Sequence, residues 1–462
     1  MPIVTEPFRI KVVEPIARTT RAEREHLLRE HGYNLFGLPA SAVTYDLLTD
    51  SGTSAMSAAQ WGAMMIADES YAGSRSFERF QAAVRELTGF RHVLPTHQGR
   101  AAERILCQIA VRPDSLVPSN GHFDTTRANL EFVGAEALDL PVPESGLASA
   151  ELPFKGNIDL ERLAQVVREE RDRIPFGMLT LTNNIEGGQP VSLANVRAAA
   201  AILHAAGIPL ILDACRFAEN AYLVKLREDG QEERTPAAIA REIFRLADGC
   251  TLSAKKDGLS NMGGFLALND DGWAARGRNL LILTEGFPTY GGCAARDLEA
   301  VTVGLSEVLD PDYLAYRLAT ITWIARGLDR AGIPTVKPWG GHAVFLDAKA
   351  LLPRIPPERF PGVALACELY LAGGIRACEI GSAMFGKVGE DGRFQGARRE
   401  LVRLAIPRRV YTQSHMEQVV EACADVATRA GSLPGYTLVD RPPFLPHFTA
   451  RFLPQVEMPA GR

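Results

Sequence analysis

Short, continuously apolar runs alternate with amphipathic segments over residues 58–310 of the chain. One unit begins at Ser192, which can cap a helix. The run over 208–213 follows it and is continuously apolar up to the final Asp213, as in a strand buried on both faces. A second unit pairs the Thr235-Pro236 helix start with an apolar run over 250–254. This alternation predicts an α/β fold with a mostly parallel sheet that helices cover on both sides.

From residue 311 the pattern changes to a mixture of helices and strands that is typical of a smaller α+β unit. A long helix over 314–332 precedes an apolar strand over 340–348, and a second strand is expected over 398–406. Three units are therefore predicted: an N-terminal arm over 1–19, a small domain over 20–57 and 311–462, and a large cofactor-binding domain over 58–310.

Composition excludes several classes of protein. The formal charge is −5 and acids and bases are interspersed, so no basic face suggests nucleic acid as a partner. No apolar run reaches the length of a membrane span, and the N-terminus lacks the apolar stretch of a signal peptide. The seven cysteines form no Cys-x-x-Cys pair, which indicates free thiols in a reducing cytoplasm. The nine histidines show no spacing typical of a transition-metal site.

Two motifs that follow predicted strands carry the strongest chemical signal. Asp213 ends one apolar run, and Lys256 in Ser253-Ala-Lys-Lys256 follows the next. An acid that can hold a pyridinium nitrogen and a lysine that can form a Schiff base are what pyridoxal phosphate (PLP) requires. Arg216 could then bond the phenolate oxygen of the ring, although Asp213 and Arg216 could also form a buried ion pair. The two motifs together predict a PLP site.

Other candidate residues also follow predicted strands, where open parallel sheets bind their ligands. Backbone N–H groups at Gln98-Gly99-Arg100 could cradle a phosphate, or the segment could be a plain strand–helix turn. Phe123 could stack on the cofactor ring or belong to the core. Asn184 could donate to the ring oxygen or to a substrate carboxylate, or it could serve a turn.

Long motifs along the chain resemble the β-eliminating lyases of aromatic amino acids. They include Leu48-Thr-Asp-Ser-Gly-Thr53, Pro95-Thr-His-Gln-Gly-Arg100, Glu285-Gly-Phe-Pro-Thr-Tyr-Gly-Gly292 and Ile406-Pro-Arg-Arg409. The resemblance implies an aspartate-aminotransferase-like fold (fold type I) and PLP as cofactor. It also implies a homotetramer built from catalytic dimers.

The resemblance assigns roles to residues that match the family's motifs. Lys256 corresponds to the Schiff-base lysine, and Tyr71 to a tyrosine that reaches the neighbouring subunit's site and protonates the leaving group. The implied cofactor contacts are Gln98, Gly99, Arg100, Phe123, Asn184, Asp213, Arg216 and Ser253. The implied substrate contacts are Thr49, Ser51, Asn184, Ile380 and Arg403, of which Arg403 binds the α-carboxylate. The implied site for a monovalent cation, usually K⁺, comprises Gly52, Glu69 and Asn261.

Three positions indicate which ring is cleaved. Ile380 stands where tyrosine-cleaving members carry an arginine for the phenol hydroxyl. Asp124 and His447 match the aspartate and histidine of the tryptophan-cleaving members. Two departures are noted: Glu186 stands where the family usually has a small residue, and Asn261 is closer to the tyrosine-cleaving members.

The sequence therefore predicts α,β-elimination of L-tryptophan to indole, pyruvate and ammonium, with Lys256, Tyr71, Asp124 and His447 as catalytic residues. The alternatives are the same chemistry on tyrosine, on a modified tryptophan or on an S-substituted cysteine. A PLP-binding protein without turnover is a more distant alternative, because no segment outside the two domains could supply a partner module.

Overall fold

The computed structural model describes residues 4–389, 391–443 and 445–455. Its centre is a seven-stranded sheet whose strands stand side by side in the order β2 (His92–Thr96), β8 (Gly264–Leu268), β7 (Gly249–Ser253), β6 (Leu210–Asp213), β5 (Gly177–Thr180), β3 (Leu116–Ser119) and β4 (Glu136–Asp139). β8 runs antiparallel to β2 and β7, and the remaining pairs are parallel. The predicted α/β fold with a mostly parallel sheet is confirmed.

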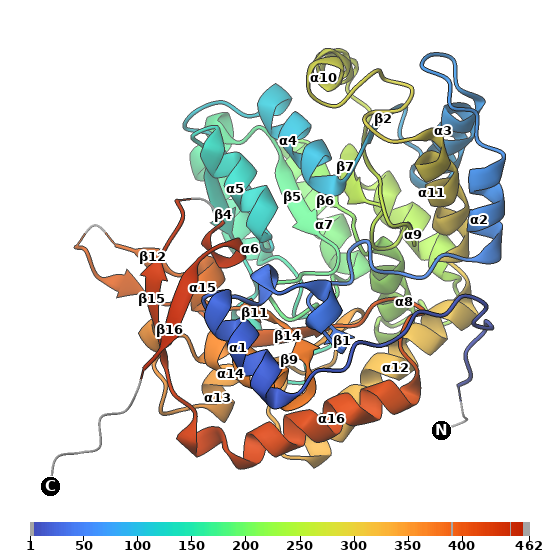
Figure 1. Cartoon of the computed structure of the whole chain (residues 1–462). Helices are drawn as coiled ribbons and strands as arrows, with labels where there is room; N and C mark the ends of the chain where they lie inside the picture. Colours follow the sequence, from blue (N-terminus) through green and yellow to red (C-terminus); the bar gives the residue numbers. More distant parts are fainter. Residues whose placement is uncertain (1–3, 390, 444, 456–462) are drawn as a thin grey trace, which may run out of the picture.

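Helices cover both faces of this sheet (Figure 1). In β6, Leu210 and Leu212 belong to one buried cluster, whereas Ile211 belongs to the cluster on the other face. The first cluster includes side chains of α3 (Arg75–Thr88), α6 (Leu160–Glu170), α7 (Leu193–Ala205), α8 (Phe217–Arg227), α9 (Pro236–Arg245) and α11 (Ala295–Glu307). The second includes side chains of α4 (Gly99–Ala110), α5 (Asp124–Phe132) and α10 (Asp271–Thr284). Burial on both faces explains why Leu210, Ile211 and Leu212 of β6 are all apolar rather than alternating with polar residues.

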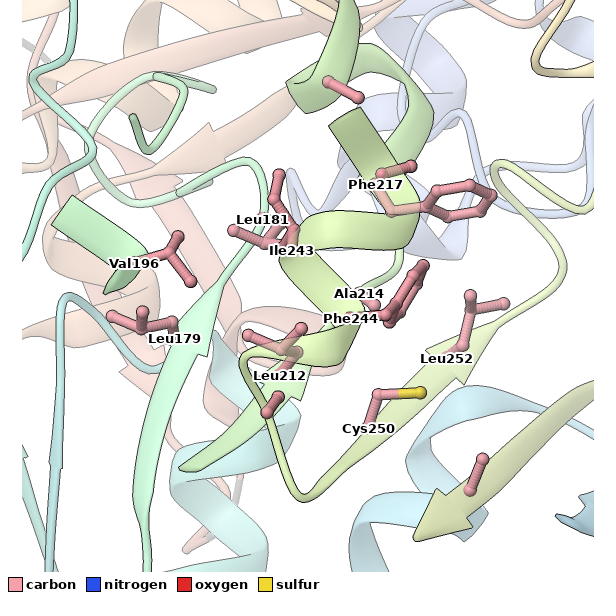
Figure 2. Close-up of a cluster of buried hydrophobic side chains, with 14 of the residues drawn as sticks. Leu179, Leu181, Val196, Leu212, Ala214, Phe217, Ile243, Phe244, Cys250 and Leu252 are labelled. Atoms are coloured by element: carbon pink, nitrogen blue, oxygen red, sulfur yellow. The ribbon is translucent and has the colours of Figure 1, made fainter. Parts of the chain in front are cut away.

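Figure 2 shows part of the first cluster, where Phe244 of α9 and Phe217 of α8 pack beside Leu252 of β7 and Leu212 of β6. The helix starts follow the sequence signals. The Ser192 hydroxyl accepts a hydrogen bond from Asn195 N at the start of α7, and Thr235 caps α9. These two caps were predicted and are confirmed.

A three-stranded antiparallel sheet lies below the large sheet (Figure 1). Its order is β11 (Cys378–Ile380), β14 (Leu401–Ala405) and β9 (Ala343–Asp347). Its main helices are α1 (Arg21–Glu30), α12 (Pro311–Arg330), α14 (Pro361–Gly373) and α16 (Gln413–Thr428). The remaining α-helices are α2 (Ala58–Met65), α13 (Ala348–Leu351) and α15 (Ser382–Phe385). The remaining strands form three pairs: β1 (Tyr45–Asp46) with β10 (Ile375–Arg376), β12 (Lys387–Val388) with β13 (Phe394–Gln395), and β15 (Tyr436–Asp440) with β16 (Arg451–Pro454).

Residues distant in sequence share the core around the small sheet. This core joins side chains from 28–47 with side chains from 321–452, and Figure 1 shows α1 beside α14. Helix α12 connects the two regions, because Leu314 packs in the core of the large sheet and Ile324 in that of the small sheet. We propose on this basis that the chain divides into a small domain of 20–57 and 311–462 and a large domain of 58–310. In the arm, Phe8 packs edge-on against Tyr316 at 5.1 Å. Among the described residues, no helix is long and apolar enough to cross a membrane.

Two carboxyl groups are buried together in the small sheet. Glu379 accepts hydrogen bonds from Ala383 N (3.0 Å) and Met384 N (3.2 Å), and Glu400 accepts one from the Ser382 hydroxyl. Burial, followed by the charge of Glu400, raises the pKa of Glu379 to about 8. Burial also raises the pKa of Glu400 to about 7. At neutral pH the pair therefore retains a proton.

Glu379→Gln is expected to flatten the pH dependence of stability. The pKa of Glu379 lies above its ordinary value of 4.5, so the folded protein keeps a proton that the unfolded chain releases. The contribution of this proton to the free energy of unfolding is therefore fully present below that ordinary value. It is lost as the pH rises through about 8, by up to about 1.4 kcal/mol per pH unit. Thermal unfolding at several pH values should show a smaller decline for the variant, whereas Glu421→Gln on the exposed side of α16 should behave as wild type. Equal declines for wild type and Glu379→Gln would contradict the buried proton.

Candidate active site

A cavity of about 220 Å³ lies at the carboxyl ends of the central strands and is closed on its other side by the small sheet. Asp213 is the last residue of β6, and Ser253 is the last residue of β7. Cys378 of β11 and Arg403 of β14 face them. Ligands of open parallel sheets bind at this edge, so the cavity is the candidate active site. It is lined by the predicted residues Thr49, Ser51, Gln98, Gly99, Arg100, Phe123, Asp124, Asn184, Asp213, Arg216, Ser253, Lys256, Arg403 and His447.

One end of the cavity is suited to a phosphate. Gln98 is the N-cap residue of α4, and its side chain makes no capping hydrogen bond. A Cβ atom on Gly99 would stand 2.6 Å from Ser253 Cβ, so only glycine lets α4 begin this close to the end of β7. The free N–H groups and positive end of the helix therefore point to the cavity. Arg100 adds a charge there, and its Cζ lies 5.9 Å from the centre of the Phe448 ring.

The middle of the cavity contains the acid and the lysine. Asp213 is buried, and its carboxylate accepts a long hydrogen bond from Cys215 N at 3.4 Å. Lys256 lines the same cavity. Glu103 of α4 also lines it, and burial, followed by the charge of Asp213, raises the pKa of Glu103 to about 7. Sequence reasoning missed Glu103, since a glutamate in an amphipathic helix carries no signal of burial.

Arg216 was expected beside the phenolate oxygen of the cofactor. Its guanidinium lines the cavity but is held by Asp50, with Nε–Oδ2 at 3.0 Å and Nη2–Oδ1 at 2.7 Å. Arg408 Nη1 also donates to Asp50, at 2.9 Å. Burial would raise the pKa of Asp50, but Arg216 and Arg408 hold it well below the ordinary value. Asp50 thus fixes Arg216 at the cavity wall. The Leu48–Thr53 motif included Asp50, but its partner lies too far along the chain to be inferred.

A carboxylate-binding arrangement lies on the small-sheet side. Arg403 donates from Nη1 to Asn184 Oδ1 at 3.3 Å and from Nη2 to Leu48 O at 3.0 Å. Its Nε is buried and has no hydrogen-bond partner among the residues that the structure describes. Its Cζ lies 5.9 Å from the centre of the Phe123 ring. A buried guanidinium with an unused donor suits an anionic group of the substrate.

Aromatic rings and one close contact between a histidine and an aspartate form the remaining wall. His447 Nε2 lies 3.1 Å from Asp124 Oδ2, and both side chains are buried. The His447 ring packs against Phe36 and Phe448, with centroids 5.7 and 4.1 Å away. Phe36, Phe448, Cys215, Cys378 and Met384 also line the cavity and had not been assigned to it from the sequence.

Some predicted site residues do not reach the cavity within one chain. Tyr71 is 70% exposed and stacks on Phe287 at 5.4 Å. Ile380 is buried in a cluster with Cys378 and Met384 and does not itself line the cavity. Glu69 caps α11 by accepting from Ala295 N at 3.0 Å. The roles of these three residues therefore remain predictions.

The residues of the cavity fit PLP. The helix start at Gln98 and Gly99 suits its phosphate, and the buried carboxylate of Asp213 lacks a strong partner and suits the ring nitrogen. Lys256 shares the cavity with both. These donor and acceptor groups match the cofactor that the sequence predicts.

Comparisons with known proteins agree with this architecture. Residues 46–422 match the family described as Beta-eliminating lyase. The Tryptophanase of Salinibacter ruber (strain DSM 13855 / M31) is 59% identical over 455 residues, which cover 98% of this chain and 96% of the relative. The Tyrosine phenol-lyase of Pasteurella multocida (strain Pm70) is 47% identical over 451 residues, which cover 97% of this chain and 98% of the relative. Among solved structures, Sphingomonas wittichii Serine palmitoyltransferase superposes with a TM-score of 0.58 and 14% identity, covering 89% of this chain and 97% of that chain.

The structural likeness and the strand order define an α/β protein of fold type I, the fold class of many PLP-dependent enzymes. The chain belongs to the β-eliminating lyase family. The family implies PLP as cofactor, and the protein is a PLP-dependent β-eliminating lyase.

Proposed function

We propose that this lyase cleaves L-tryptophan by α,β-elimination to indole, pyruvate and ammonium. The observation that carries the choice of substrate is the buried Asp124–His447 pair, 3.1 Å apart, in the aromatic wall of the cavity. A ring with a polar N–H group and an apolar body suits a wall of this composition. The relative named Tryptophanase, at 59% identity, supports the same choice over the relative named Tyrosine phenol-lyase, at 47%.

When bound, PLP supplies an electron sink for negative charge at the substrate's α-carbon. Asp213, which is buried at the end of β6, would hold a proton on the ring nitrogen. Arg403, assisted by Asn184, would orient the substrate through its α-carboxylate. Thr49 and Ser51 line the same side of the cavity and would complete this contact. Lys256 Nζ would take the α-proton as general base.

The leaving ring needs a proton at its C3 atom before it can depart. Asp124 would pass or steer that proton, and His447 would hold the carboxylate of Asp124 and the ring in place. Tyr71 would donate the proton from a neighbouring subunit. The exposed ring of Tyr71, which packs against the half-buried rings of Phe287 and Tyr290, supports this, because exposed aromatic side chains are enriched at subunit interfaces.

We further propose a homotetramer built from catalytic dimers, with K⁺ or another monovalent cation near Gly52, Asn261 and Glu69. Asn261 Nδ2 donates to Gly52 O at 3.0 Å, and the Asn261 carbonyl oxygen lies 3.0 Å from the place of a Gly52 Cβ. These oxygens suit a hard cation. Glu69 would join them across a subunit interface. All seven cysteines are free, which supports the proposed location in the cytoplasm.

Asp124→Ala is expected to separate two substrates. Elimination from L-tryptophan should fall by about a hundredfold or more, because the indole ring loses the carboxylate that passes or steers its proton. Elimination from S-methyl-L-cysteine should change by less than about fivefold, since a thiolate leaves without ring protonation. Pyruvate release from each substrate provides the measurement. Equal losses on both substrates would contradict the assigned role, and the exposed Glu131→Gln on the same helix serves as a control.

A further inference from the structure

Glu186 is a buried acid next to the active site that the reaction does not use. It follows Asn184 by two positions, its residue is 2% exposed, and it does not line the cavity. Its carboxylate faces two arginines, with Arg398 Nη1–Oε1 at 2.9 Å and Arg399 Nη2–Oε2 at 2.8 Å. The charge of Glu186 is thus compensated outside the cavity, and it does not face the substrate.

The two arginines lie next to the small three-stranded sheet. They stand directly before β14, the strand that carries Arg403. Arg399 is largely buried and also donates from Nη1 to Glu186 O at 3.5 Å. Arg398 reaches a third segment by donating from Nη2 to Ser145 Oγ at 2.9 Å. The Glu186 side chain therefore ties the segment of Asn184 to the strand of Arg403.

Among the described residues, no second acid forms an ion pair with Arg398 or Arg399. Lys155 is buried nearby, and burial, followed by the charge of Arg399, lowers the pKa of Lys155 to about 8. Within the described part of the chain, Arg399 Nε has no hydrogen-bond partner, and the contact of its Nη2 with Glu186 is an ion pair without hydrogen-bond alignment. Loss of the Glu186 charge would leave clustered cations that repel one another, so the two segments would separate more easily.

A second contact joins the same two segments inside the cavity, where Arg403 Nη1 donates to Asn184 Oδ1 at 3.3 Å. That bond is long and has to adjust when a carboxylate binds. The ion pairs outside the cavity can hold the segments together while it does so.

We propose that Glu186 is a positioning residue that acts through Arg398 and Arg399 to hold Asn184 and Arg403 in register for the substrate's α-carboxylate. This inference rests on the proposed carboxylate-binding role of Arg403. It predicts an effect on substrate binding that exceeds the effect on the chemical step.

The test uses the PLP-loaded enzyme and the variant Glu186→Gln, which keeps the side-chain shape and removes the charge. KM for L-tryptophan should rise about tenfold with kcat within about twofold. The dissociation constant of L-alanine, followed by the absorbance of the bound cofactor, should rise by the same factor. Amide hydrogen exchange in residues 182–190 and 396–404 should accelerate. Glu144→Gln, an exposed acid in the neighbouring 143–146 segment, should change none of these.

A double-mutant cycle with Arg399→Gln decides whether the ion pair is responsible. The dissociation constant of L-alanine in the double variant should not exceed the larger of the two single-variant values, because both changes remove the same interaction. Strictly additive losses, or unchanged binding and exchange in Glu186→Gln, would overturn the proposal. L-alanine has no leaving ring, so this test remains valid even if the enzyme's substrate is an amino acid other than tryptophan. If Arg403→Leu does not weaken L-alanine binding, the carboxylate assignment fails independently of the exchange result.

Discussion

Lys256→Ala is expected to abolish elimination and to remove the visible absorbance of the bound cofactor without unfolding the protein. Lys256 lies in the cavity with Asp213 and the helix start at Gly99, so its amine is placed both to hold the cofactor covalently and to move the α-proton. Loss of both roles should lower kcat by at least about a thousandfold. Absorbance spectra, circular dichroism and pyruvate release measure the three effects.

Lys255→Ala is the matched control for this prediction, since Lys255 is adjacent in sequence and also lines the cavity. It should retain the covalent link, which borohydride reduction followed by peptide mass spectrometry locates on a single lysine. A reduced adduct on Lys255, or full absorbance in Lys256→Ala, would refute the assignment of Lys256.

Arg403→Leu is expected to lower kcat/KM for L-tryptophan by about a hundredfold or more while the cofactor spectrum stays intact. The guanidinium is buried and donates hydrogen bonds to Asn184 Oδ1 and Leu48 O, and no described residue accepts a hydrogen bond from its Nε. A charge-assisted contact with the substrate's carboxylate of about 3 kcal/mol corresponds to this factor. The loss should appear mainly in KM, because the contact orients the substrate before the proton is moved.

Arg403→Lys provides a second variant at the same position for comparison with Arg403→Leu. Lysine keeps the charge but cannot bind a carboxylate through two parallel donors, so it should recover only part of the lost affinity. Unchanged KM in Arg403→Leu would mean that the carboxylate binds elsewhere, and complete recovery by lysine would argue against a two-point contact.

The sequence predicted the elements whose signals are local. Ser192 and Thr235 mark helix starts by capping, and the 208–213 segment, which is apolar up to its final aspartate, contains β6. The candidate cofactor residues could be grouped because parallel strands bring their carboxyl ends to one edge, and the structure places Asp213 and Lys256 in one cavity.

The contacts that were missed join residues far apart in the chain. Asp50 holds Arg216 across 166 positions, and Arg398 reaches Glu186 across 212. Neither pairing leaves a periodic trace in the sequence. β8 runs antiparallel to its neighbours in the large sheet. The glycine-rich segment before it does not indicate in which direction the strand runs. The substrate contact expected of Ile380 stays a prediction: its side chain packs in one cluster with Cys378 and Met384, which line the cavity.

The most direct measurement is product analysis with the purified, PLP-loaded enzyme in K⁺ buffer. L-tryptophan, L-tyrosine and S-methyl-L-cysteine are supplied separately, and indole, phenol and pyruvate are quantified. The buried Asp124–His447 pair and the identification as a β-eliminating lyase predict indole and pyruvate in equal amounts from tryptophan, with little phenol from tyrosine. Phenol from tyrosine without indole from tryptophan, or pyruvate from the cysteine derivative alone, would contradict the proposed substrate.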